Sequence, residues 1–326
     1  MSKKDSVTSK YLRKNHIFAD AFNFFIYGGE QVIDPASLQE LDTRGIVVPR
    51  DSANESHEPI QRFRDTIKTM HAMFDDHGAY VILAVESQSY INYAMPVRTL
   101  TYDAMQYTKQ VEEIAATHKL DGSYHGVSGD EYISGFYKSD RILPVITLVI
   151  YFADKEWDGP MSLREMFKMN DEHLLSLVQD YKINLIAPAL LRDEDFDLFH
   201  SSLKEVLLFI KHANNKKEVR ELVEKDEAYN HMDRDAVEVI NVCTGANLPV
   251  REEEETIDMC QGIKEWIEDE RAEAAKASAE AAKKEKISIL RKSVKALMEK
   301  TGMSLEQTLS ALEVSQSDQE ELMPLL

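Results

Sequence analysis

Two polar side chains end a strongly apolar stretch of the sequence, and a third precedes that stretch. Residues 79–85 form a continuous apolar run rich in β-branched side chains, which predicts a buried β-strand. Glu86 and Gln88 follow it, and because strand side chains alternate between faces, both should lie on one face. Asp65 lies about twenty residues before Glu86. Two acids and an amide would then converge, and carboxylate oxygens at that spacing suit a hard divalent cation such as Mg²⁺.

A turn between two strands would bring Asp65 back to Glu86. The sequence Asp-Asp-His-Gly, which ends at Gly78, has turn chemistry, and its glycine can adopt a positive φ angle. If the strands pair antiparallel about Asp75 and Asp76, Asp65 stands opposite Glu86. A register shift of two residues would still leave the carboxylates diagonal neighbours, about 7–8 Å apart. The alternative interpretation is that both acids are solvated strand ends.

The order and spacing of these residues resemble those of a known nuclease family. Asp65, Glu86 and Gln88, the last followed by Ser89, are similar to the motif of the PD-(D/E)xK nuclease superfamily. The similarity is greatest to the Rpn-type recombination-promoting nucleases and putative transposases, in which Gln occupies the usual Lys position. It spans roughly residues 12–250 and includes FADAFNFFIYGGEQVIDPASLQELDT, MPVRTLTYDAMQYTKQ, RILPVITLVIYF and YKINLIAP. The resemblance implies an α/β fold with a restriction-endonuclease-like core, in which helices flank a mixed sheet, plus additional helices and a long C-terminal helical tail.

For the site, the resemblance implies metal-dependent hydrolysis of DNA phosphodiester bonds in recombination or in mobile elements. Asp65, Glu86 and the backbone carbonyl of Ser87 are the expected ligands of Mg²⁺ or another divalent cation. Gln88 is expected to orient water, because its amide donates and accepts hydrogen bonds but carries no positive charge. We therefore expect a slower catalyst than one with Lys at this position.

Three further residues are candidates for the same site. Asp20 lies on a helix predicted over residues 11–27, and the resemblance implies that an acid of this helix approaches the metal. Arg98 and Tyr102 lie four residues apart on one face of an amphipathic helix predicted over residues 95–118. Arg98 would contact a phosphate with support from Tyr102. The alternatives are a solvated acid at Asp20, a surface arginine and a half-buried tyrosine.

The distribution of charge limits how this chain could bind DNA. Residues 1–110 hold 12 Lys and Arg against 14 Asp and Glu, a net charge of −2, so residues 111–326 carry −18 of the total of −20. Proteins that bind duplex DNA along their surface are basic on the contacting face. Composition thus argues against tight, non-specific binding, although a bound divalent metal would offset part of the negative field.

The sequence predicts three segments. Residues 1–250 form the nuclease-like domain, with strands over 142–152 and 183–187 and helices over 193–212, 217–224 and 233–243. Residues 119–138 contain four glycines and predict a long loop. Residues 251–300 predict a long, charged, Ala-rich helix that fits a weak coiled coil, and residues 301–326 a small helical segment. A solvated single helix is the competing interpretation of the Ala-rich segment.

Composition and cysteine spacing bear on the location of the protein. Cys243 and Cys260 are far apart and lack Cys-x-x-Cys spacing, which favours free thiols and a reducing cytoplasm. No apolar run approaches eighteen residues, so we expect no membrane span. The resemblance implies DNA as a partner, and the long C-terminal helix predicts a second copy of the chain as another.

The acidity, the substituted lysine and the long tail also suit a different class of protein. In that alternative the nuclease fold is catalytically weak or inactive and acts as an oligomeric interaction module. A metal-dependent phosphoesterase for small substrates is a weaker alternative, because the glycines of residues 119–138 lack the spacing that cradles phosphates.

Overall fold

The structure is a computed structural model that describes residues 3–41, 68–75, 78–122, 126–250 and 255–325. The chain forms two compact units, Met1–Cys260 and Gln261–Leu326. Among the described residues, no helix combines the length and the apolar composition that crossing a membrane requires.

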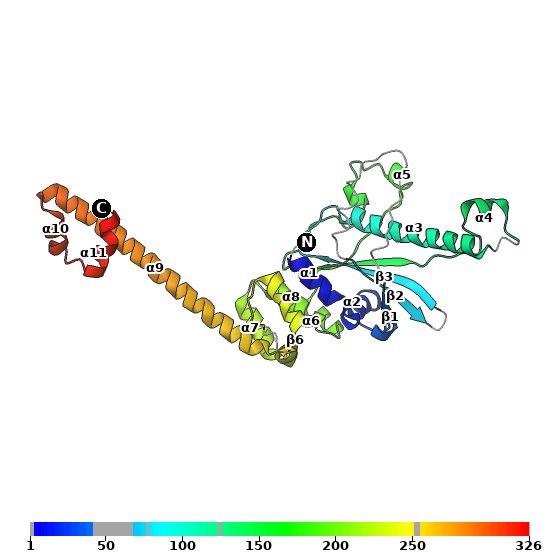
Figure 1. Cartoon of the computed structure of the whole chain (residues 1–326), viewed down its shortest axis with the longest axis horizontal. Coiled ribbons are helices and arrows are strands. Elements are labelled where there is room, and N and C mark those ends of the chain that lie inside the picture. The colour runs from blue at the N-terminus through cyan, green and yellow to red at the C-terminus, as the bar shows by residue number, and fades with distance from the viewer. Residues whose placement is uncertain (1–2, 42–67, 76–77, 123–125, 251–254, 326) are drawn as a thin grey trace. The chain divides into compact units, whose positions relative to one another are not determined.

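A mixed five-stranded sheet is the centre of the first unit (Figure 1). Its strand order is β1-β2-β3-β4-β5; the β1–β2 and β2–β3 pairs are antiparallel, and the β3–β4 and β4–β5 pairs are parallel. The strands are β1 (Leu38–Glu40), β2 (Lys68–Asp75), β3 (Gly78–Gln88), β4 (Val145–Tyr151) and β5 (Asn184–Ile186). This arrangement confirms the predicted α/β class with a mixed sheet.

The two central strands are apolar because both of their faces are covered. β3 contains the predicted run from residue 79. β4 begins directly after Pro144, so the proline, which has no N–H to donate, stays outside the strand. Leu83, Leu148 and Ile150 are fully buried. Near-continuous apolar strands are typical of parallel pairs with helices on both faces.

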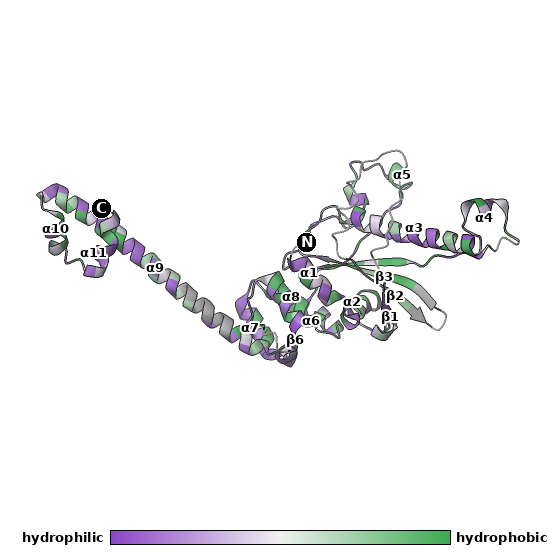
Figure 2. Ribbon diagram, in the orientation of Figure 1, coloured by the Kyte–Doolittle hydropathy of each residue, from purple (hydrophilic) through white to green (hydrophobic). Residues whose placement is uncertain are grey.

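One helix covers one face of the sheet, and a group of helices covers the other (Figure 1). α3 (Met95–Asp121) packs on β4 and confirms the predicted amphipathic helix. Figure 2 shows both hydrophilic and hydrophobic residues along its length. The opposite layer contains α1 (Lys3–Leu12), α2 (Asn15–Tyr27), α6 (Leu203–His212) and α8 (Arg234–Thr244).

The helix predicted over residues 11–27 is two helices. A break at Arg13 and Lys14 separates α1 from α2, and α2 ends at Gly28, whose φ of 61° suits a residue without a side chain. α1 packs on β3 and on α8, and Asp235 of α8 forms ion pairs with Lys10 of α1 and with Lys14 in the break after it. Burial alone would raise the pKa of Asp235, but the hydrogen bonds from both lysines lower it.

The segment predicted as a loop over residues 119–138 contains a helix. α3 continues to Asp121, and α4 (Gly129–Ser134) follows with a capping box formed by Ser128 and Glu131. Backbone N–H groups of Lys138 and Ser128 donate to the Glu131 carboxylate and lower its pKa to about 2. The capping signal is present in the sequence, but the glycines on either side of it favoured a loop.

The other elements of the first unit are short. The helix predicted over residues 193–212 is a 3-10 helix, η6 (Asp193–Leu198), followed by α6. β4 and β5 pair in parallel, so the chain crosses over between them, with α5 (Glu172–Leu175) in the connection. α7 (Lys216–Lys225) confirms a predicted helix, and β6 (Met232–Asp233) pairs with β7 (Thr256–Ile257).

The second unit has a small core of its own. α9 (Met259–Thr301) ends before Gly302, and it is followed by α10 (Leu305–Ala311) and α11 (Gln316–Leu322). Val294 and Ile287 of α9 pack with Leu309 and Leu322 in one cluster. The apolar positions that suggested a coiled coil over this part of α9 are therefore buried within the chain. Self-association through the tail stays a prediction.

Candidate active site

Glu86 and Gln88 occupy the end of β3 and face α3. Their side chains are 0% and 3% exposed, and the Gln88 Nε2 atom donates to the Glu86 Oε2 atom over 3.3 Å. The predicted placement of both side chains on one face is confirmed. They lie at the carboxyl end of the parallel β3–β4 pair, where open α/β sheets bind ligands.

The predicted register of the hairpin is wrong. The Cα partner of Glu86 is Lys68, which begins β2, and not Asp65. Pairing starts with Asp75 opposite Gly78, and an irregularity at residues 73–74 shifts the register further. Asp65 itself lies outside the described residues.

Ser87 faces the opposite layer. Its hydroxyl donates to the Thr8 Oγ1 atom of α1 over 2.6 Å, and its backbone is in register with Ile150 of β4. The alternation of side chains along β3 thus divides the motif residues between the two helical layers.

Arg98 contacts Glu86 directly. Its Nε atom lies 3.5 Å from the Glu86 Oε2 atom, and its guanidinium lies 5.9 Å from the centre of the Tyr102 ring. The Arg98 side chain is only 16% exposed, and Tyr102 is buried. Arg98 is therefore the counter-charge of a buried carboxylate and is not an ordinary surface arginine.

A second buried acid lies further along α3. The Asp103 carboxylate accepts hydrogen bonds from the Thr147 hydroxyl of β4 and the Tyr181 phenol, each 2.5 Å long. The Asn184 amide donates to the backbone oxygen of Thr147 over 2.9 Å. Burial is the larger cause, and the hydrogen bond to Asp103 the next, of a raised pKa of Tyr181, so its phenol stays protonated.

These contacts make a polar layer between α3 and the sheet. Tyr102 is one buried member of this layer. The other buried members are Glu86, Gln88, Thr99, Asp103, Gln106 and Thr147. Sequence reasoning missed Asp103 and Thr147, although a signal existed. Thr147 places a hydroxyl group inside an otherwise apolar strand. Thr99, Asp103 and Gln106 recur at helical spacing and form a polar stripe.

Comparison with known proteins adds the family. Residues 69–235, just over half of the chain, match the family described as "Putative transposase, YhgA-like". The chain belongs to this family. No curated protein and no solved structure matches it.

The match to the YhgA-like family includes Glu86, Gln88, Arg98 and Asp103 but not Asp65, and it agrees with the resemblance found in the sequence. Asp20 is also outside the match. Its two carboxylate oxygens accept hydrogen bonds from the backbone N–H groups of His200 and Ser201 and from the Ser201 hydroxyl. Asp20 is 2% exposed, so it is neither a solvated acid nor a neighbour of α3, and it anchors the segment before α6.

The donor atoms of this YhgA-like site can be tested against a divalent cation. Glu86 offers a carboxylate and Ser87 a backbone carbonyl, and both are hard donors of the kind that Mg²⁺ accepts. Within the described ranges, no group of three or more His, Cys, Asp or Glu side chains is placed to hold a metal. The donors fit a divalent cation in kind, and a complete ligand set needs a residue such as Asp65.

Proposed function

We propose that this YhgA-like protein is a metal-dependent DNA endonuclease that acts in recombination or on mobile elements, with Asp65, Glu86 and Gln88 as its catalytic residues. The main support is the acid–amide pair of Glu86 and Gln88, buried on one face at the carboxyl end of β3 in a chain of a transposase family. The PD-(D/E)xK core is part of the same proposal and is supported by the mixed sheet with helices on both faces.

Each residue has a distinct task in this proposal. Asp65, Glu86 and the Ser87 carbonyl would hold Mg²⁺, whose chemistry when bound is to stabilise negative charge on a scissile phosphate. Gln88 donates through Nε2 to Glu86, which leaves its amide oxygen to accept from and orient the attacking water. Arg98 limits the repulsion between Glu86 and the substrate.

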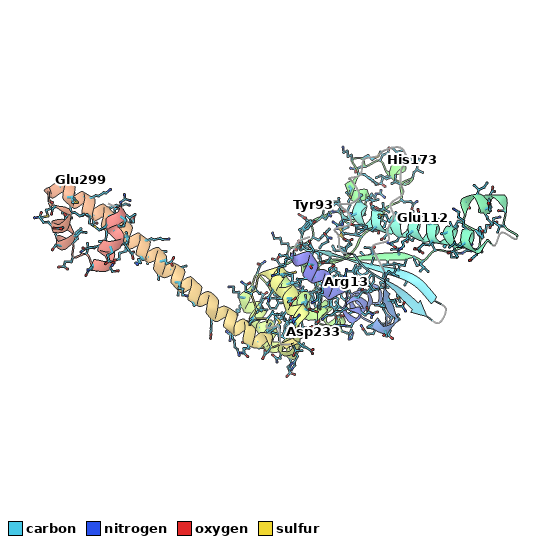
Figure 3. All side chains as sticks on the ribbon, in the orientation of Figure 1. Arg13, Tyr93, Glu112, His173, Asp233 and Glu299 are labelled. Carbon is cyan, nitrogen blue, oxygen red and sulfur yellow. The ribbon has the colours of Figure 1, made fainter. Side chains whose placement is uncertain are left out.

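Nicking of supercoiled plasmid in Mg²⁺ tests the activity. Glu86→Gln keeps the shape of the buried side chain while removing its charge, and Asp65→Ala removes the other acid. Each should slow nicking at least about 100-fold, because loss of one ligand weakens both metal binding and charge stabilisation. Glu112→Ala is the control, since Glu112 is an exposed acid on α3 (Figure 3) and should nick like wild type. Equal nicking by all four proteins would refute the proposal and indicate a contaminating nuclease.

One observation favours the rival function, an inactive nuclease fold that acts as an interaction module. Glu86 is fully buried beside Arg98, and a fixed cation at a carboxylate can substitute for a metal. In that case calorimetry on the wild-type protein would show no Mg²⁺ binding. Heat of binding that is present in wild type and absent in Asp65→Ala supports the enzyme.

A further inference from the structure

Two exposed aromatic side chains follow the motif directly. Tyr90 and Tyr93 are 58% and 59% exposed, whereas Gln88, two residues before Tyr90, is 3% exposed. Both lie in the connection from β3 to α3, which leaves the sheet at the carboxyl end of β3. Ligands of open α/β sheets bind at this edge. Large aromatic side chains at such a position offer flat apolar faces to whatever approaches the site.

Tyr93 is held in place by the loop that follows β4. Its phenol donates to the Asp158 Oδ1 atom over 2.9 Å, and this hydrogen bond raises the pKa of Tyr93. The turn before α3 is also fixed, because the backbone N–H of Ala94 donates to the Asn92 side chain over 3.0 Å. The Tyr93 ring is therefore fixed at its hydroxyl end while much of its surface stays exposed. Figure 3 labels Tyr93 near the N-terminal end of α3.

The charges beside these tyrosines do not favour phosphate contacts. The loop after β4 carries Asp154, Glu156 and Asp158 against Lys155, and Arg98 is committed to Glu86. A DNA duplex presents its phosphates outward and hides the faces of its bases. A single strand exposes those faces, and stacking on an aromatic side chain contributes about 1–3 kcal/mol per base.

We propose that Tyr90 and Tyr93 form a stacking platform for unpaired bases, so that the substrate class of this site is DNA with a single-stranded segment beside the cleaved bond. The inference rests on the proposed function for the identity of the ligand as DNA. It adds which form of DNA the site accepts and which two residues make the choice.

Fluorescence anisotropy with the full chain tests this in EDTA, using a labelled twelve-residue oligothymidine and a labelled duplex of the same length. Wild type should bind the single strand more tightly than the duplex. Tyr90→Ala and Tyr93→Ala should each weaken single-strand binding roughly 5- to 150-fold, the loss expected for one stacked base. Because few phosphates are neutralised, wild-type affinity should fall less than about tenfold between 50 and 200 mM salt.

Two variants serve as controls. Tyr93→Phe keeps the ring and should bind within about twofold of wild type, which separates stacking from the bond to Asp158. Tyr132→Ala removes a tyrosine that is 61% exposed on α4, at the far end of α3, and it should change nothing. A helix of this length separates the two ends by about 40 Å.

Three results would each overturn the inference: no binding of the single strand by wild type, binding of the duplex at equal or higher affinity, or unchanged binding by both alanine variants. The nuclease proposal can fail independently. Binding is measured without metal or cleavage, so a protein that stacks bases but does not nick plasmid refutes the enzyme alone, and the reverse result refutes the platform alone.

Discussion

Replacement of Asp103 by alanine tests whether the polar layer between α3 and the sheet holds the site together. The substitution removes two short hydrogen bonds and leaves the buried Thr147 hydroxyl and the Tyr181 phenol without their acceptor. Bonds to a charged group contribute about 1.5–3 kcal/mol each, and a buried hydroxyl left without a partner costs about 1–3 kcal/mol. We therefore expect Asp103→Ala to lower the free energy of unfolding by about 3–5 kcal/mol. Asp103→Asn, which retains one acceptor and can donate to the other hydroxyl, should lower it by about 1–2 kcal/mol.

Urea denaturation followed by tryptophan fluorescence measures these changes. The chain has two tryptophans, and a Trp266→Phe background leaves Trp157, which is 7% exposed and packs in the core next to Tyr151, as the reporter for the first unit. Metal-free conditions separate stability from ligand binding.

A double-mutant cycle decides whether the hydrogen bond carries the effect. Thr147→Val should cost about 1–3 kcal/mol in the wild-type background and close to nothing in Asp103→Ala, where its hydroxyl has already lost its acceptor. Additive effects, with a coupling below about 0.5 kcal/mol, would refute the reasoning. So would a loss below about 1 kcal/mol in Asp103→Ala itself.

Three further outcomes are expected. Burial raises the pKa of Tyr229 well above its ordinary value, so above about pH 10 the unfolded chain loses a proton that the native state keeps. The free energy of unfolding should therefore fall by up to about 1.4 kcal/mol per pH unit. In alkaline urea titrations, the Tyr229→Phe protein should show a shallower fall. Val294→Ala should lower the free energy of unfolding of the second unit by about 2 kcal/mol in thermal denaturation, and it should leave the molar mass in light scattering unchanged. Dissociation of an oligomer would instead place Val294 in a contact between chains. Asp20→Asn should destabilise the first unit by about 2 kcal/mol, since one carbonyl oxygen replaces a carboxylate that accepts three hydrogen bonds from residues 200–201. Loss of nicking by a fully folded Asp20→Asn protein would contradict the structural role of Asp20.

Local signals predicted the central elements well. The apolar run of β3, the proline before β4 and the glycine after α2 act within a few residues, so periodicity and backbone chemistry suffice to place them. A local signal also starts α10, where the Ser304 hydroxyl accepts from the backbone N–H of Gln307. The alternation of side chains along β3 likewise predicted that Glu86 and Gln88 share a face.

Features set by packing across the sheet were not predictable in this way. The register of β2 against β3 depends on an irregularity at residues 73–74 that has no local signature, and an offset of three residues places Lys68 opposite Glu86. The ion pair between Arg98 and Glu86 depends on how α3 is rotated about its axis on the sheet, which helical periodicity alone does not determine. The burial of Asp20 depends on a segment about 180 residues away in the sequence.

The contact between α1 and α8 constrains the order in which the first unit can assemble. Lys10 and Lys14 near the start of the chain bind Asp235, and α1 also lies on β3. During synthesis, the α1 side of β3 cannot be closed by this pair of helices until α8 has left the ribosome. A fragment restricted to residues 69–235 would lack α1 and nearly all of α8. Such a fragment should expose apolar strand surface and aggregate, although it contains β3, β4 and β5 and nearly all of β2.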